Sequence, residues 1–104
     1  MKTNLKLSKV ATIDIGSNAI RLLISNVFEI KGVKYHTKNS LYRVQLRLGD
    51  DSFKYGTLSE KNYGKLKSTL KSFKLILEIN EIKKYLAYAT SAMRNLNNGE
   101  KILM

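Results

Sequence analysis

Residues 10–26 constrain the fold of this chain more than any other stretch, because two apolar, β-branched runs are joined by Asp-Ile-Gly-Ser-Asn. This pattern predicts a strand, a tight turn and a second strand. Asp14 closes the first strand, and Gly16 lets the backbone turn because it has no Cβ. Ser17 and Asn18 offer side-chain donors beside the backbone N–H groups of the turn, which together suit an anion. Since Asp14 would repel a bare phosphate but attract its Mg²⁺, the segment predicts a corner for phosphate and a divalent cation.

The same five residues also fit an ordinary hairpin turn. In that interpretation Asp14 and Asn18 cap backbone groups, and Gly16 adopts a positive φ. Turn chemistry alone leaves the structural and the functional interpretation equally open.

Length and composition limit the remaining possibilities. With 104 residues, 43% hydrophobic and 26% charged, the chain is expected to form one small folded domain. It has no cysteine, which excludes disulfides and thiolate metal sites. A single histidine, His36, excludes a two-histidine metal centre and argues against a Ser/His/Asp triad. We expect His36 to be exposed on a strand and give it no functional role.

The net charge is +11, from 19 Lys+Arg against 8 Asp+Glu. Such a charge attracts polyanions, and nucleic acid is one candidate. The lysines are dispersed, however, without an Arg-rich block, which favours a solvated surface over nucleic-acid binding. No apolar run approaches the roughly 20 residues of a membrane helix, and no signal peptide is evident. We therefore expect a cytoplasmic protein without a membrane partner.

Three strands are expected in the first half, at 9–15, 19–28 and 33–48, joined by short turns into an antiparallel meander. The first is almost continuously apolar, which predicts burial on both faces. Gly32 supplies the permissive backbone of the second turn. The end of the third strand alternates between an apolar and a cationic face. The apolar residues are Tyr42, Val44, Leu46 and Leu48, and Arg43, Gln45 and Arg47 alternate with them.

A long amphipathic helix is expected next, running to about Glu78. Thr57 and Glu60 have the spacing of a capping box, although Ser59 is an alternative N-cap. Gly64 lies inside the helix and would permit a close approach to the sheet. The expected core stripe has helical spacing and consists of Tyr63, Leu66, Leu70, Phe73 and Leu77.

The aromatic and alanine run at 85–89 predicts a buried fourth strand. Strand, helix and strand form a βαβ unit, so this strand should be parallel to the strand with which it pairs. Thr90 or Ser91 would then cap a helix whose first N–H groups favour anions, with Arg94 as a bidentate clamp. A capped helix start with an exposed arginine is the structural alternative.

These segments together resemble the N-terminal part of the Ppx/GppA phosphatases, the exopolyphosphatases and guanosine pentaphosphate phosphohydrolases. The resemblance extends from about Ala11 to Asn95. Its strongest residues lie at 13–18 with 21–24, at 47–49 and at 89–94. The family shares a superfamily with actin, sugar kinases and heat-shock chaperones. The resemblance therefore implies an α/β fold, a partial ribonuclease-H-like lobe with a three-strand antiparallel meander, a helix and a parallel fourth strand.

The resemblance also implies roles for particular residues. Asp14 would help to hold Mg²⁺ or another divalent cation, directly or through water. Arg47 matches the family pattern without an assigned role, and Asp50 and Asp51 replace the usual acidic residue and glycine. The phosphate-binding residues would be Gly16, Ser17, Asn18 and Arg21 in the first phosphate loop, 14–18, and Ser91 and Arg94 in a second anion corner, 90–94.

In this family the catalytic acidic residue, a second Gly-rich phosphate loop and the second lobe would follow the last residue of this sequence. We therefore expect residues 1–104 to form a single truncated lobe without a catalytic residue, which binds polyphosphate or guanosine penta- or tetraphosphate. A non-catalytic polyanion-binding module is the alternative. An uncovered fourth strand would be an apolar edge, so we also expect a homo-oligomer or a strand-swapped dimer.

Overall fold

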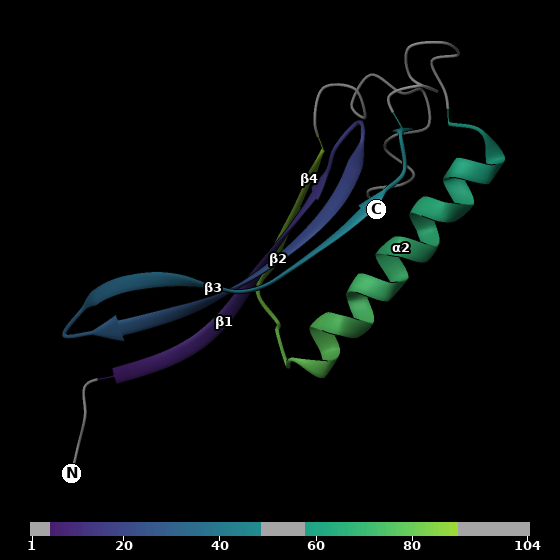
Figure 1. Ribbon diagram of the computed structural model, residues 1–104. Coiled ribbons are helices and arrows are strands. Elements are labelled where there is room, and N and C mark those ends of the chain that lie inside the picture. Colours follow the sequence, from purple (N-terminus) through teal and green to yellow (C-terminus); the bar gives the residue numbers. More distant parts are fainter. Residues whose placement is uncertain (1–4, 49–57, 90–104) are drawn as a thin grey trace.

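The computed structural model describes residues 5–48 and 58–89. Within these ranges the elements are β1 (Leu5–Ile15), β2 (Ala19–Ile30), β3 (Val33–Gln45), α2 (Glu60–Ile79) and β4 (Tyr85–Ala89). The four strands form one sheet in the order β3-β2-β1-β4, with α2 against one of its faces (Figure 1). No helix in the described ranges is long and apolar enough to cross a membrane.

The predicted pairing of the strands is confirmed. β1 pairs with β2 and β2 with β3 in antiparallel fashion, and β4 is parallel to β1. The predicted bounds of the fourth strand match β4, whereas β1 and β2 are longer than expected and β3 ends earlier, at Gln45. The sequence therefore predicts the topology well and the strand ends less well.

The turn between β2 and β3 consists of Lys31 and Gly32, which both have positive φ, 51° and 83°. Such a pair is typical of a type I′ hairpin, whose twist matches that of the flanking strands. Further along the hairpin, Ser25 pairs with Lys38 and Ile24 pairs with Ser40, so Asn39 is the extra residue of a β-bulge. Figure 1 shows that this hairpin extends well beyond α2.

Both ends of α2 are capped by local chemistry. Ser59 is the N-cap, and its hydroxyl oxygen accepts a hydrogen bond from the backbone N–H of Asn62 at 3.2 Å. At the other end, the N–H of Ile82 donates to the carbonyl of Leu77 at 2.9 Å, and the N–H of Glu81 donates to that of Glu78 at 3.0 Å. These two bonds form a Schellman motif, with Glu81 in the left-handed conformation usually taken by glycine.

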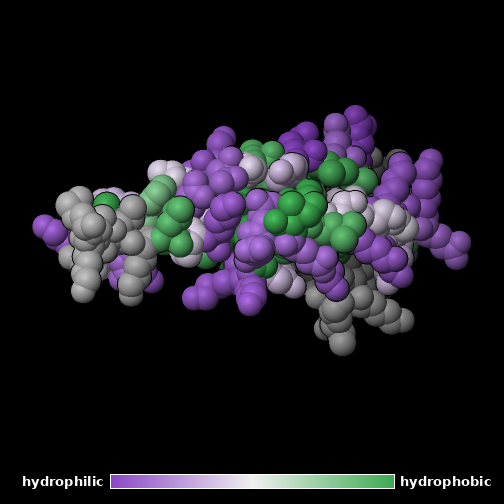
Figure 2. Space-filling model, turned by 90° about the horizontal axis from the view of Figure 1, so that it is seen from below, coloured by the Kyte–Doolittle hydropathy of each residue, from purple (hydrophilic) through white to green (hydrophobic). Residues whose placement is uncertain are grey.

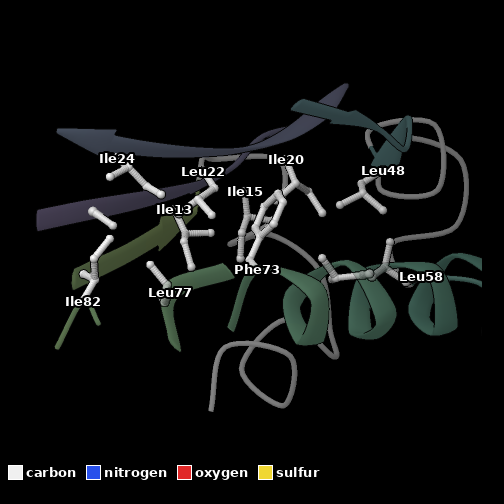
Figure 3. Close-up of a cluster of buried hydrophobic side chains, with 12 residues drawn as sticks. Ile13, Ile15, Ile20, Leu22, Ile24, Leu48, Leu58, Phe73, Leu77 and Ile82 are labelled. Atoms are coloured by element: carbon white, nitrogen blue, oxygen red, sulfur yellow. The ribbon is translucent and has the colours of Figure 1, made fainter. Parts of the chain in front are cut away.

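The core lies between the sheet and α2 (Figure 3). The predicted helical stripe is largely confirmed: Leu66, Phe73 and Leu77 are buried, and Tyr63 and Leu70 pack against them at partial burial. The expected close approach at Gly64 is wrong, because Gly64 is exposed and a Cβ there would have no atom within 4 Å. The sheet contributes the side chains of Ala11, Ile13, Ile15, Ile20, Leu22 and Ile24.

Two burial predictions also fail. β1 is not buried on both faces, because Val10, Thr12 and Asp14, which alternate with its buried residues, are only half-buried. β4 is not buried either: its first four residues are exposed and Ala89 is half-buried. In the described part of the chain β4 is an edge strand that pairs with β1 alone, so its apolar composition does not determine its burial.

Candidate functional site

The first candidate site residues lie where β1 ends and β2 begins. The N–H of Gly16 donates to the carbonyl oxygen of Ala19 at 2.9 Å, which closes the turn. A Cβ on Gly16 would lie 3.0 Å from this same oxygen, so the close approach favours glycine. Gly16 does not have a positive φ, unlike the glycine of the ordinary hairpin turn considered above. Its N–H is already bonded, so it adds no donor to the expected anion-binding concavity.

Asp14 is the most unusual residue at this corner. Its Oδ1 atom is buried and has no hydrogen-bond partner. A buried carboxylate oxygen without a partner costs free energy, of the order of 1–3 kcal/mol, unless a cation or donor satisfies it. In the described part of the chain no group of three or more His, Asp or Glu side chains forms a metal cage. Mg²⁺ often binds to proteins through one or two carboxylates, with waters and substrate phosphates completing its shell. Asp14 therefore fits this kind of metal site.

Arg21 lies directly across from Asp14 in the pairing of β1 with β2. The next residue in the same row, on β3, is Arg43, and on β4 it is Tyr88. Side chains in register share one face of a sheet, and this row lies on the face opposite α2. Two arginines directly opposite each other repel, so a bound anion would stabilise this pair. Arg21 and Arg43 are both exposed.

The turn is also tied to the segment that follows β3. The carbonyl oxygen of Asn18 accepts two hydrogen bonds, from the N–H groups of Leu46 at 3.0 Å and of Arg47 at 3.2 Å. Arg47 is not on the cationic face of a strand as predicted, because β3 has ended and its φ is 47°. In sequence Arg47 only matches the family pattern, and the structure adds its backbone hydrogen bond to Asn18.

The sequence pattern therefore indicated part of this corner. The structure brings Asp14, Gly16, Ser17, Asn18 and Arg21 together in one turn and its flanking strands. Their roles in binding remain predictions. The pattern did not single out Arg43, although its place on a cationic face was a signal. The second anion corner, 90–94, with Ser91 and Arg94, lies outside the described residues, as do Thr57, Asp50 and Asp51.

In the described residues, the four-stranded mixed sheet with α2 on one face is a lobe of the actin-like ATPase fold, and solved structures share it. The Aquifex aeolicus member of the Ppx/GppA protein family superposes with a TM-score of 0.82 and 28% identity, covering 94% of this chain and 31% of that one. An exopolyphosphatase from Cytophaga hutchinsonii superposes with a TM-score of 0.76, covering 91% and 29%. Its identity of 24% supports the fold alone.

Sequence comparison leads to the same family. Exopolyphosphatase 1 of Mycobacterium bovis and that of Mycobacterium tuberculosis are each 30% identical over 95 residues, which is 91% of this chain. No family model matches the chain. Together with the structural neighbours, these relatives support membership of the Ppx/GppA family. It spans about a quarter of the curated relatives, 27% of their length.

Proposed function

We propose that this chain supplies one wall of a phosphoanhydride-binding site, in an exopolyphosphatase or a guanosine penta- or tetraphosphate phosphohydrolase. The observation that supports this most directly is the buried, unpartnered Oδ1 of Asp14 beside the Gly16–Asn18 turn. The exopolyphosphatase relatives point to the same class of substrate. We assign no catalytic residue within the chain.

Each residue has a specific task in this proposal. Asp14 would hold Mg²⁺ or another divalent cation, which would neutralise phosphate charge. The turn residues Ser17 and Asn18 would donate to phosphate oxygens, and Arg21 would supply a charged donor on the neighbouring strand. Gly16 serves this turn by allowing the close approach to Ala19. Ser91 and Arg94 would contact further phosphates of the same substrate.

A second candidate function is supported by the surface of α2. Hydrophilic residues cover most of the face in Figure 2, with hydrophobic patches between them. Lysines exposed on such a surface would bind polyanions without a defined site, and the affinity would fall steeply as the salt concentration rises. The exposed lysines of α2 are Lys61, Lys65, Lys67, Lys71 and Lys74.

The two functions differ in how binding depends on Mg²⁺ and on Asp14. We would titrate tripolyphosphate into the chain by isothermal calorimetry at fixed ionic strength, with and without Mg²⁺. Asp14→Asn should abolish the gain in affinity caused by Mg²⁺. Glu29→Gln is the matched control, since it removes one negative charge from β2 far from the turn. Arg94→Ala should weaken binding with Mg²⁺ present.

The proposed site would be refuted if Mg²⁺ did not strengthen binding, or if Asp14→Asn and Glu29→Gln behaved alike. Binding that falls with salt but ignores both Mg²⁺ and Asp14 would instead support the lysine surface.

A further inference from the structure

Arg47 has a backbone conformation that its neighbours in sequence do not explain. Three non-glycine residues in the described ranges have positive φ: Lys31, Arg47 and Glu81. Lys31 is in a two-residue hairpin turn that requires this conformation, and Glu81 is in the Schellman motif after α2. Arg47 is in neither kind of structure, since it lies two residues beyond the end of β3. A non-glycine residue in this region is strained, and such strain is often found at binding sites.

The surrounding structure fixes this conformation from two sides. On one side, the N–H groups of Leu46 and Arg47 both donate to the carbonyl oxygen of Asn18. On the other side, Leu48 is buried, with 1% of its surface exposed, in the core cluster that also contains Leu58. The backbone of Arg47 is thus held between the turn and the core, while its side chain is exposed.

This arrangement brings a further cationic residue to the corner. The turn residues Gly16 to Asn18 carry no charge and Asp14 is negative, so positive charge for a phosphate must come from residues that flank the turn, of which Arg21 on β2 is one. Arg47 is joined to Asn18 by a backbone hydrogen bond of 3.2 Å, and a guanidinium can bind phosphate oxygens through two parallel hydrogen bonds.

We propose that Arg47 is an additional phosphate-binding residue of this site, whose left-handed backbone positions its guanidinium beside the turn. This inference rests on the proposed function and adds a residue to it. Its guanidinium contacts phosphate oxygens of the substrate. The two backbone hydrogen bonds to the carbonyl of Asn18, from Leu46 and Arg47, hold the Arg47 backbone against the turn.

The test uses two substitutions that are alike in chemistry but differ in place. Arg47→Gly and Lys31→Gly each remove one positive charge, and each relieves one strained φ, of 47° and 51°. Neither should unfold the chain, since glycine accepts this conformation freely. Lys31 lies at the tip of the hairpin that extends beyond α2 (Figure 1), remote from the turn. If only the net charge mattered, the two variants would therefore lose the same affinity for phosphate.

We would measure tripolyphosphate affinity with Mg²⁺ by calorimetry, after thermal melts confirm that each variant is folded. Arg47→Gly should weaken binding by about ten- to a hundredfold, as expected for lost charged hydrogen bonds. Lys31→Gly should change it by less than about twofold, because salt screens distant charges. Arg47→Lys keeps the charge without the paired donors and should lie between wild type and Arg47→Gly.

Equal affinities of Arg47→Gly and wild type would overturn this inference, and so would equal losses in the two glycine variants. If Asp14→Asn abolished the Mg²⁺ effect while Arg47→Gly bound normally, the proposed function would stand and only the role of Arg47 would fail. If the wild type showed no binding dependent on Mg²⁺, both would fail.

Discussion

Alanine at Gly16 and alanine at Gly64 are the same chemical change with opposite expected effects. A Cβ on Gly16 would lie 3.0 Å from the carbonyl oxygen of Ala19, whereas a Cβ on Gly64 meets nothing within 4 Å. The same Ala19 oxygen accepts the N–H of Gly16 at 2.9 Å. Any shift that relieves the new contact therefore also disturbs the hydrogen bond that closes the turn.

The expected magnitudes follow from these contacts. Crowding of this kind costs about 1–3 kcal/mol, and the reduced freedom of the unfolded chain returns about 0.4–1 kcal/mol. Gly16→Ala should therefore lower the free energy of unfolding by about 0.5–2 kcal/mol. Gly64→Ala should raise it by about 1 kcal/mol, since alanine is the better residue inside a helix.

Urea unfolding followed by far-UV circular dichroism would measure both variants against wild type. The free energies of unfolding of the two variants should differ by about 1.5–3 kcal/mol, which corresponds to roughly 6–24 °C in Tm for a domain of this size. Equal stability of Gly16→Ala and Gly64→Ala would show that the contact with Ala19 does not limit the turn.

Three further substitutions test the helix and its caps by the same assay. Leu66→Ala should cost about 2–5 kcal/mol, because Leu66 has no exposed surface in the core; a loss below about 1 kcal/mol would contradict its place there. Glu81→Gly should stabilise the chain by about 0.5–1 kcal/mol, since its φ is 56°, and destabilisation would argue against the Schellman motif. Ser59→Ala should cost about 1 kcal/mol through the lost N-cap bond to Asn62. Ser72→Ala, in the middle of α2, is its control and should cost nothing; equal losses in the two serine variants would exclude the cap.

Local patterns predicted most of the fold. The helical spacing of Leu66, Phe73 and Leu77 predicted the buried face of α2. A strand, a long helix and another strand predicted that β4 is parallel to its neighbour. The buried face depends on the period of a single element and the direction of β4 depends on the order of the elements, and both are visible in the sequence.

Predictions that depended on what an element packs against were less successful. β4 was expected to be buried because it is apolar, yet its first four residues are exposed at the edge of the sheet in the described structure. Gly64 was expected to approach the sheet, yet a Cβ at this position would have no atom within 4 Å. In both cases composition describes the residue, whereas burial depends on the position of other elements.

The same distinction between local pattern and tertiary packing applies to the candidate site. The sequence by itself determined that Asp14 lies near the end of a strand and that Gly16, Ser17 and Asn18 form the turn to the next strand, because an Asp-x-Gly-Ser-Asn segment breaks two β-forming runs. Only the tertiary structure decided that Oδ1 of Asp14 is buried without a partner and that Arg47 is bonded to Asn18. Burial and hydrogen bonding of this kind join residues distant in sequence, so no local pattern specifies them.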